Sequence, residues 1–203
     1  RPEGLRLTMM AAAIVTAYLL GSIPFALLLS RRWSAVDLRA IGSGNIGATN
    51  AMRAAGIGPG ILVALLDAAK GAAGVALAGR LSDASAAPAA AGLAAILGHV
   101  YPIWLRFRGG KGVATACGAF SVLAPAAVPP ALAIFMGVVW LTKYVSLGSL
   151  LATLALPPLA WAFGESAPSV AAAFAAAAII VFRHRSNVGR LWAGTERRLG
   201  ARV

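Results

Sequence analysis

Residues 7–29 read LTMMAAAIVTAYLLGSIPFALLL and contain no charged side chain. An α-helix needs about 20 predominantly apolar residues to cross the hydrocarbon core of a bilayer, so this stretch is long enough to do so. The whole chain has the same character: 60% of its 203 residues are hydrophobic, 12% are charged, and the mean hydropathy is +0.81. A soluble domain usually carries about twice that charged fraction. The sequence therefore predicts an integral membrane protein.

Six further apolar segments are candidate spans. They lie at about 60–79, 86–105, 113–127, 130–142, 147–163 and 168–183. Pro129 and Pro130 divide what would otherwise be one long apolar stretch, because a proline pair ends a helix, and two short spans result. Short spans tilt little or flank a local polar cavity. We predict an all-α membrane protein with a single domain, 1–203, and seven transmembrane helices, two of them short.

Lysines and arginines are unevenly distributed among the predicted loops. If the N-terminus lies outside, fourteen of them fall in cytoplasmic segments and three fall outside, at Arg1, Arg6 and Arg80. This bias satisfies the positive-inside rule, so we expect a multi-pass protein with its C-terminus in the cytoplasm. The same rule accounts for the formal net charge of +12, which in a soluble protein would indicate nucleic-acid binding. We expect no nucleic-acid partner.

The glycine-rich segment 41–53 reads IGSGNIGATNAMR and follows the first predicted span. Glycine lets backbone N–H groups approach a ligand closely, hydroxyl and amide side chains add donors, and arginine adds a planar cationic fork. This combination is typical of a site for phosphate or a similar anion. A flexible, solvated connector is the alternative. The residues that we assign to the anion site are Gly42, Ser43, Gly44, Asn45, Gly47, Thr49, Asn50 and Arg53.

A second glycine-rich segment, 109–115, reads GGKGVAT and opens the fourth predicted span. A helix N-terminus with flanking cations attracts anions, so this turn is a second candidate anion site. A basic loop beside the membrane that binds lipid headgroups is the alternative. The candidate residues are Gly110, Lys111, Gly112 and Thr115.

The third polar segment, 183–191, reads RHRSNVGRL and leaves the last predicted span. Helical spacing places His184 and Asn187 on one face, and a histidine can act as a base near neutral pH. A basic tail whose side chains snorkel to the membrane interface is the alternative. The candidate residues are His184, Asn187, Arg190 and Glu196.

Two charged residues lie inside the predicted span 60–79. Asp67 and Lys70 are spaced i, i+3 on one helical face. Charges at membrane depth are costly and are usually paired or close to a water-filled cavity. A functional role and an ion pair that only orients the helix stay equally open. We assign both residues, together with His99 of the segment GHVYP at 98–102, a supporting role.

The three polar segments all fall on the predicted cytoplasmic side. Folding them into one anion-binding mouth would give their loop backbone the hydrogen-bond partners that it needs near the membrane. The sequence contains no Cys/His cluster typical of zinc and no aspartate set typical of a Mg²⁺-dependent phosphotransferase, so we expect no metal and no cofactor. The chemistry that remains is positioning and electrostatic stabilisation of anionic reactants.

Four motifs occur in a fixed order over residues 42–196: GSGNIGATN with Arg53, DAAKG at 67–71, GHVYP followed by GGKGVAT, and HRSNVGRL with GTE. In these motifs the chain resembles the acyl-phosphate-dependent glycerol-3-phosphate acyltransferases of bacterial membranes, the PlsY family. The resemblance implies a monomeric inner-membrane enzyme without cofactors. Such an enzyme transfers a fatty acyl group from acyl phosphate to the 1-hydroxyl of sn-glycerol 3-phosphate, the first acylation of phospholipid synthesis.

The resemblance also implies roles for individual residues. Ser43 and Lys111 would bind phosphate oxygens, and Arg53 would clamp a phosphate through two hydrogen bonds. His184 and Asn187 would orient glycerol 3-phosphate, and the backbone of residues 42–47 would form an oxyanion-type nest. An acyl phosphate is already activated, and no serine or cysteine stands beside a clear base in the sequence, so we expect direct attack without an acyl-enzyme.

One other function competes with this interpretation, and one further role is compatible with it. In a transporter or channel for a small phosphorylated anion, the same basic segments would line the entrance, although the outer loops 80–85 and 164–168 are short and bear few polar groups. A docking role for the basic tail, with the soluble enzyme that makes acyl phosphate as partner, is compatible with catalysis.

Overall fold

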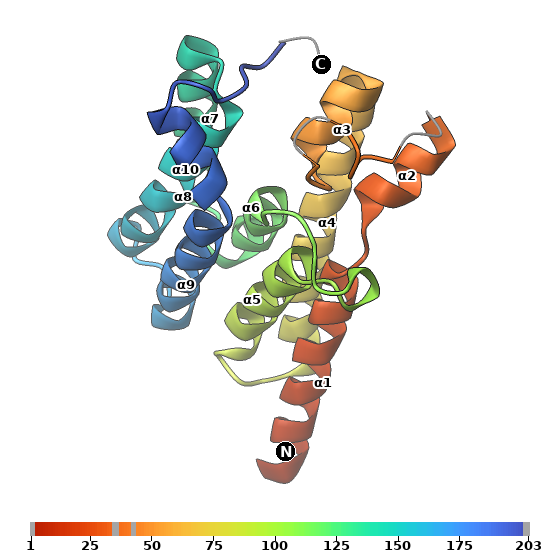
Figure 1. Cartoon of the computed structure of the whole chain (residues 1–203). Coiled ribbons are helices and arrows are strands. Elements are labelled where there is room, and N and C mark those ends of the chain that lie inside the picture. The colour runs from red at the N-terminus through yellow and green to blue at the C-terminus, as the bar shows by residue number, and fades with distance from the viewer. Residues whose placement is uncertain (1–2, 34–36, 42–43, 201–203) are drawn as a thin grey trace. The chain divides into compact units, whose positions relative to one another are not determined.

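The computed structural model describes residues 3–33, 37–41 and 44–200. Within these ranges all regular structure is helical (Figure 1). The helices are α1 (Glu3–Gly21), α2 (Phe25–Trp33), α3 (Ala48–Ala55), α4 (Ile57–Leu81), α5 (Ala87–Val100), the 3₁₀ turn η1 (Ile103–Leu105), α6 (Val113–Leu123), α7 (Val128–Thr142), α8 (Val145–Ala162), α9 (Ala167–Arg183) and α10 (Arg185–Trp192). The predicted all-α class is confirmed.

The first predicted span, 7–29, was wrong as a single helix. The helix α1 ends at Gly21, and α2 begins at Phe25 after the break Ser22–Pro24. Pro24 has no N–H and its ring clashes with the preceding turn, which explains why the helix stops although the chain stays apolar. The break leaves the Ile23 carbonyl available to a side chain from another helix, and this becomes important for the site.

The other predicted spans correspond to α4–α9, with ends that differ by up to five residues. By length and composition, four described segments could cross a membrane: Glu3–Arg32, which runs across the break, Ile57–Leu81, Ala87–Leu105 and Val145–Ala162. The bent pair Ala167–Arg183 and Arg185–Trp192 would be a fifth, and Val113–Leu123 and Val128–Thr142 are shorter apolar helices. These findings support a multi-pass membrane protein, while the number of seven spans stays a prediction.

The chain divides into two compact units, one up to Leu123 and one from Ala124. In the first unit α4 contacts α1, α3, α5 and α6, and α1 and α5 lie side by side with it (Figure 1). Their contacts are made by small residues such as Ala13, Ala17 and Ala95. A side chain on Gly21 or Gly98 would overlap the main chain of the facing helix. Small residues at helix interfaces are typical of membrane proteins, because they let the backbones approach closely.

The contact between α4 and α6 gives a direct test of this packing. A Cβ on Gly118 of α6 would overlap the main chain of Ala68 in α4. We expect Gly118→Ala to lower the free energy of unfolding by about 1–3 kcal/mol or more, because overpacking forces the backbones apart. The measurement is thermal unfolding of the purified protein in detergent. Gly137→Ala in α7 is the matched control, since a Cβ there meets nothing within 4 Å. An unchanged midpoint for Gly118→Ala would contradict the packing.

The second unit contains α7–α10, in which α8 packs against both α7 and α9. The helix α9 ends at Arg183, and the chain turns by 57° at His184 before α10 begins. The tail returns to the start of α8, because the N–H of Leu199 donates to the carbonyl of Lys143 at 2.7 Å. The tail that follows the third polar segment is therefore bound to the residue after α7.

Candidate active site

The glycine-rich segment 41–53 is only half loop. Gly42 and Ser43 lie outside the described residues. The loop interpretation was wrong for the second half, since Thr49, Asn50 and Arg53 belong to α3. This helix forms because Asn50 and Ala51 are buried on one side of it, while Gly60 of α4 brings α4 into contact with Met52.

Asn50 binds the glycine-rich segment to the residues that precede it. Its side chain is buried, and its Nδ2 donates to the carbonyl oxygens of Leu38 at 2.8 Å and Ile41 at 3.1 Å. A buried amide that bonds two loop carbonyls fixes the path of the chain into the glycine-rich segment. Gly44 adopts the left-handed region with φ 66°, which glycine adopts without strain. Arg53, in the last turn of α3, is half-buried.

The second segment forms a turn that opens α6. The N–H groups of Gly109 and Gly110 donate to the carbonyls of Val100 and His99, each at 3.0 Å, so the turn is bound to the end of α5. Gly112 has φ 89° and precedes the first helical residue, Val113. The first N–H groups of a helix have no intrahelical acceptor, and here they follow directly after half-buried Lys111. This is the arrangement expected of an anion site.

Thr115, a predicted ligand residue, is fully buried at the contact with Gly71 of α4. Its hydroxyl is the one buried side-chain oxygen or nitrogen without a hydrogen-bond partner in the part of the chain that the structure describes. The backbone of α6 approaches α4 closely at Thr115. This contact also fixes the position of the Gly109–Lys111 turn, which directly precedes α6.

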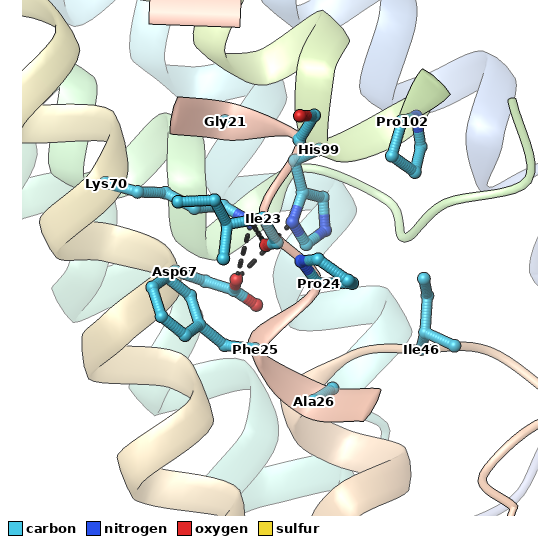
Figure 2. A pocket seen from close by; sticks show the side chains of 11 residues that line it. Gly21, Ile23, Pro24, Phe25, Ala26, Ile46, Asp67, Lys70, His99 and Pro102 are labelled. Atoms are coloured by element: carbon cyan, nitrogen blue, oxygen red, sulfur yellow. Dashed lines mark hydrogen bonds and ion pairs between the residues drawn. The ribbon is translucent and has the colours of Figure 1, made fainter. Parts of the chain in front are cut away.

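Asp67, Lys70 and His99 form a buried charged network (Figure 2), and the ring of His99 lies against Gly110 of this turn. Lys70 Nζ is 2.8 Å from Asp67 Oδ1, and His99 Nδ1 is 3.5 Å from the same oxygen. Lys70 also donates to the Ile23 carbonyl at 2.8 Å, in the break between α1 and α2, and its ammonium is 5.7 Å from the centre of the Phe25 ring. The predicted ion pair of Asp67 and Lys70 is confirmed, and His99 joins it.

The network lines a small pocket together with residues from three other places in the sequence. Gly21–Ala26 come from the break after α1, Pro102 follows α5, and Ile46 lies in the first glycine-rich segment (Figure 2). The pocket leaves ≈ 10 Å³ for the centre of a water molecule, about the minimum that one water needs. The first predicted polar segment therefore reaches this network through Ile46, and the second lies against it through Gly110, since a Cβ on Gly110 would overlap the His99 ring.

In the second unit, Glu196 organises the third polar segment. Its Oε1 accepts hydrogen bonds from Ser146 Oγ at 2.8 Å and Asn187 Nδ2 at 2.7 Å, and its Oε2 accepts from Arg190 Nε at 2.7 Å. His184 is buried at the bend, with Nδ1 2.8 Å from the Ile180 carbonyl. In this geometry the Glu196 carboxylate orients Asn187 and Arg190, while its predicted role in binding substrate stays a prediction.

These hydrogen bonds set the protonation behaviour of Glu196. Burial alone would raise the pKa of this carboxyl, but the hydrogen bonds from Asn187, Ser146 and Arg190, and the charge of Arg190, outweigh burial and lower the pKa below its ordinary value of 4.5. A carboxyl whose pKa is lower in the folded state than in the unfolded state stabilises the fold at pH values above its ordinary pKa. This stability is lost as the pH falls through the folded-state pKa.

We therefore expect Glu196→Gln to lower the thermal midpoint at pH 7. Its effect should shrink as the pH falls below about 4.5, where the carboxyl of the unfolded chain takes up a proton, and vanish once the pH has passed the lower folded-state pKa. The measurement is the difference in thermal midpoint between the two proteins across this pH range. Glu165→Gln, at a half-buried carboxyl for which the structure shows no side-chain ion pair in the described residues, is the control. A difference that does not change with pH would contradict the assignment.

Sequence reasoning missed three parts of these arrangements. The break at Ser22–Pro24 supplies the Ile23 carbonyl, and its signal was Pro24 inside an apolar run. Ser146 is an ordinary serine at the start of α8, and nothing in the sequence marks it as a partner of Glu196. The indole of Trp104 donates to Ser22 Oγ at 2.7 Å, which ties the segment after α5 to the end of α1.

Comparison with known proteins matches this chain to one family. The sequence model of the glycerol-3-phosphate acyltransferases matches residues 11–194. The chain belongs to the glycerol-3-phosphate acyltransferase family. Similar members are the glycerol-3-phosphate acyltransferases of Geobacter sulfurreducens, 49% identical over 91% of this chain and 95% of the relative, and of Nitrobacter winogradskyi, 48% identical over 94% and 96%.

Solved structures of this family have the same fold. The crystal structure of PlsY (YgiH), an integral membrane glycerol 3-phosphate acyltransferase, in its glycerol 3-phosphate form matches with a TM-score of 0.89 and 38% identity, covering 94% of this chain and 96% of that one. Its lysophosphatidic acid form matches with a TM-score of 0.87 and 37% identity. The resemblance that the motifs indicated is thus confirmed at the level of the family.

Proposed function

We propose that this protein transfers a fatty acyl group from acyl phosphate to the 1-hydroxyl of sn-glycerol 3-phosphate, giving lysophosphatidic acid and inorganic phosphate. The observation that carries the proposal is the match over 94% of the chain to a glycerol 3-phosphate acyltransferase whose two crystal forms are named for glycerol 3-phosphate and for lysophosphatidic acid. Acyl phosphate as donor is supported by the motif set, which offers cations and backbone donors for phosphate but no serine or cysteine beside a clear base in the sequence.

The phosphate groups of the two substrates would be held by the predicted residues. The N-terminal turn of α6 supplies backbone N–H groups, and Lys111 supplies a point charge beside them. Arg53 on α3 supplies a planar fork for two parallel hydrogen bonds. Ser43 and the backbone of residues 42–47 are proposed to bind the remaining oxygens, and His184, Asn187 and Arg190 to orient glycerol 3-phosphate.

The reaction would be a direct displacement at the acyl carbon. The oxygen of the 1-hydroxyl attacks the carbonyl carbon, the bond between that carbon and the phosphate oxygen breaks, and the electron pair leaves with phosphate. The hydroxyl proton passes to a phosphate oxygen of a substrate. The residues then contribute positioning of two bound reactants and stabilisation of the developing negative charge, two effects that each account for several kcal/mol in other enzymes.

An acyl-enzyme would contradict this mechanism. Purified protein incubated with acyl phosphate in the absence of glycerol 3-phosphate should keep its unmodified mass by mass spectrometry. An acyl adduct on Ser43 or Cys117, formed and consumed as fast as turnover, would instead indicate two successive transfers. Cys117→Ser with full activity would support the direct route independently.

The proposed placement follows from the charge distribution. We propose seven spans in the bacterial inner membrane, with the N-terminus outside and the glycine-rich and basic segments at the cytoplasmic face, where both phosphorylated substrates are available. The acyl chain would stay in the lipid phase among the helices. The protein would act as a monomer, with the soluble enzyme that makes acyl phosphate as a possible docking partner of the basic tail.

The rival function, transport of a small phosphorylated anion, is tested in proteoliposomes. We expect labelled glycerol 3-phosphate to appear as labelled lysophosphatidic acid when acyl phosphate is added, with one inorganic phosphate released per product. Without acyl phosphate, the label should not enter the vesicles faster than into protein-free vesicles. Uptake of the label without product formation would refute the enzyme and support the transporter.

A further inference from the structure

The buried network of Asp67, Lys70 and His99 lies between the two glycine-rich segments of the first unit. Ile46 of the first segment lines the same small pocket as the three network residues (Figure 2). Gly110 of the second segment lies against the imidazole of His99 so closely that a Cβ on Gly110 would overlap the ring at Nε2. The charged network and the phosphate-binding turn are therefore in direct contact.

His99 is held on the side of the ring that faces away from the turn. Its Nδ1 is 3.5 Å from Asp67 Oδ1, while Lys70 holds that same carboxylate oxygen at 2.8 Å. Lys70 in turn is fixed by the Ile23 carbonyl at 2.8 Å. The side chains of Asp67, Lys70 and His99 are at most 8% exposed. A row of buried contacts thus runs from the break after α1, through α4, to the imidazole of His99.

His99 is also bound to the turn through its main chain, because its carbonyl accepts the N–H of Gly110 at 3.0 Å. The turn therefore rests on His99 twice, once through this hydrogen bond and once through the ring. Groups that bind a reactant must be held within about 0.5 Å of the productive geometry, and residues behind them usually provide this precision. A buried imidazole that is itself anchored to an ion pair is suited to this task.

We propose that His99, oriented by Asp67 and Lys70, is a positioning residue for the phosphate site formed by the Gly109–Lys111 turn. The imidazole sets the position of the turn, and thereby of Lys111 and of the N–H groups that open α6. The identity of the bound phosphate compound rests on the proposed function; the placement of the turn by His99 does not. A histidine that only stabilised α5 would affect unfolding, but it would leave the affinity for phosphate compounds unchanged.

Steady-state kinetics separate a role of His99 in positioning the turn from a role in stabilising α5 alone. We expect His99→Ala to raise the KM for glycerol 3-phosphate or for acyl phosphate by about 10- to 100-fold, because small displacements of binding groups are costly, with kcat changed far less. Whichever substrate shows the rise is the one whose phosphate the turn holds. His99→Asn keeps a donor near Asp67 but lacks the part of the ring beneath Gly110, so it should fold more stably and show the same rise. Unchanged KM values for both substrates in either folded variant would overturn the proposal.

Changing the sizes of the side chains at positions 110 and 99 together tests the contact between Gly110 and the ring of His99. Gly110 does not have a positive φ, so alanine there is strained only by its neighbour. We expect Gly110→Ala to weaken binding strongly and the double variant His99→Ala/Gly110→Ala to recover part of the loss, because the new methyl group enters the space that the ring has left. The readout is the dissociation constant for inorganic phosphate and for glycerol 3-phosphate by calorimetric titration. A double variant that binds no better than Gly110→Ala would overturn the proposal.

A spectroscopic test is independent of the reaction. The chain has two histidines, so ¹⁵N spectra of histidine-labelled protein in detergent contain two ring systems, and His184→Gln assigns them. If Asp67 orients His99, the neutral ring should carry its proton on Nδ1, the atom that faces the carboxylate. A ring protonated on Nε2 would refute the anchoring. If both this and the titrations succeed while no acyl transfer is found, the proposed function fails and the positioning role stands.

Discussion

Replacing Lys111 with alanine is expected to lower kcat/KM by about 100- to 1,000-fold, the range seen when one preorganised donor to a developing charge is removed. Lys111 follows Gly109 and Gly110, whose N–H groups are bound to the end of α5, and it directly precedes the open N-terminus of α6. Its ammonium is the cation nearest in sequence to the N–H groups at the start of α6. Arg53→Ala should have an effect of the same order, since it removes the planar fork proposed to clamp a phosphate.

Two further variants sharpen this prediction. Arg53→Lys keeps the positive charge but loses the fork, so it should recover little of the activity if two parallel hydrogen bonds matter. Arg108→Ala is the matched control, because Arg108 is an exposed cation in the same loop and two of the loop's hydrogen-bonded glycines separate it from Lys111. The measurement is steady-state kinetics of purified protein, with thermal unfolding to confirm that each variant is folded. Near-normal turnover of Lys111→Ala or Arg53→Ala would refute the assignment of that residue.

Asp67→Asn is expected to cause the largest loss of stability, about 3–5 kcal/mol, because removing one partner of a buried ion pair leaves the other charge uncompensated. The side chains of Asp67 and Lys70 are each 3% exposed. Without the carboxylate charge, Lys70 keeps the Ile23 carbonyl and the ring of Phe25, and neither carries a negative charge. The measurement is the thermal midpoint and the half-life of the purified protein in detergent.

The double variant Asp67→Asn/Lys70→Met removes both charges and should recover much of the lost stability, since a buried pair can be replaced by neutral groups at little cost. Asp37→Asn is the control for an ion pair in water. The hydrogen bonds from Arg39 hold the pKa of Asp37 at about 2, but both side chains are about half exposed, so solvent screens the pair and its loss should change the midpoint little. Equal effects of Asp67→Asn and Asp37→Asn would contradict the buried network.

The helices were predictable wherever hydrophobicity alone decides them. The apolar segments 60–79 to 168–183 became α4–α9. The apolar stretch is divided as predicted, but the division lies between Leu123 and Val128, and the proline pair 129–130 lies in the first turn of α7 rather than ending a helix. The break after Gly21 was missed because Pro24 is a single residue in the mainly apolar stretch 7–29, and one proline hardly changes the mean hydropathy of such a stretch. The helix α3 was missed because glycine, serine and asparagine around it favour a loop, and only burial of Asn50 and Ala51 against neighbouring elements makes it helical.

The site was predictable as a set of residues but not as a set of contacts. The spacing of Asp67 and Lys70 indicated an ion pair, because neighbours three apart on a helix face each other. His99 lies 32 positions beyond Asp67, and their contact depends on how α4 and α5 pack, which periodicity does not determine. For the same reason the bonds of Glu196 to Ser146 and Asn187 could not be inferred from the sequence. That all three polar segments form one site stays a prediction.

The acyl donor is identified by comparing two donors with the purified protein. Glycerol 3-phosphate is supplied with acyl phosphate in one assay and with the acyl-CoA of the same chain length in another, and lysophosphatidic acid and inorganic phosphate are both quantified. We expect product from acyl phosphate alone, with one phosphate released per lysophosphatidic acid formed. Product from acyl-CoA at a comparable rate, or product from neither donor, would contradict it.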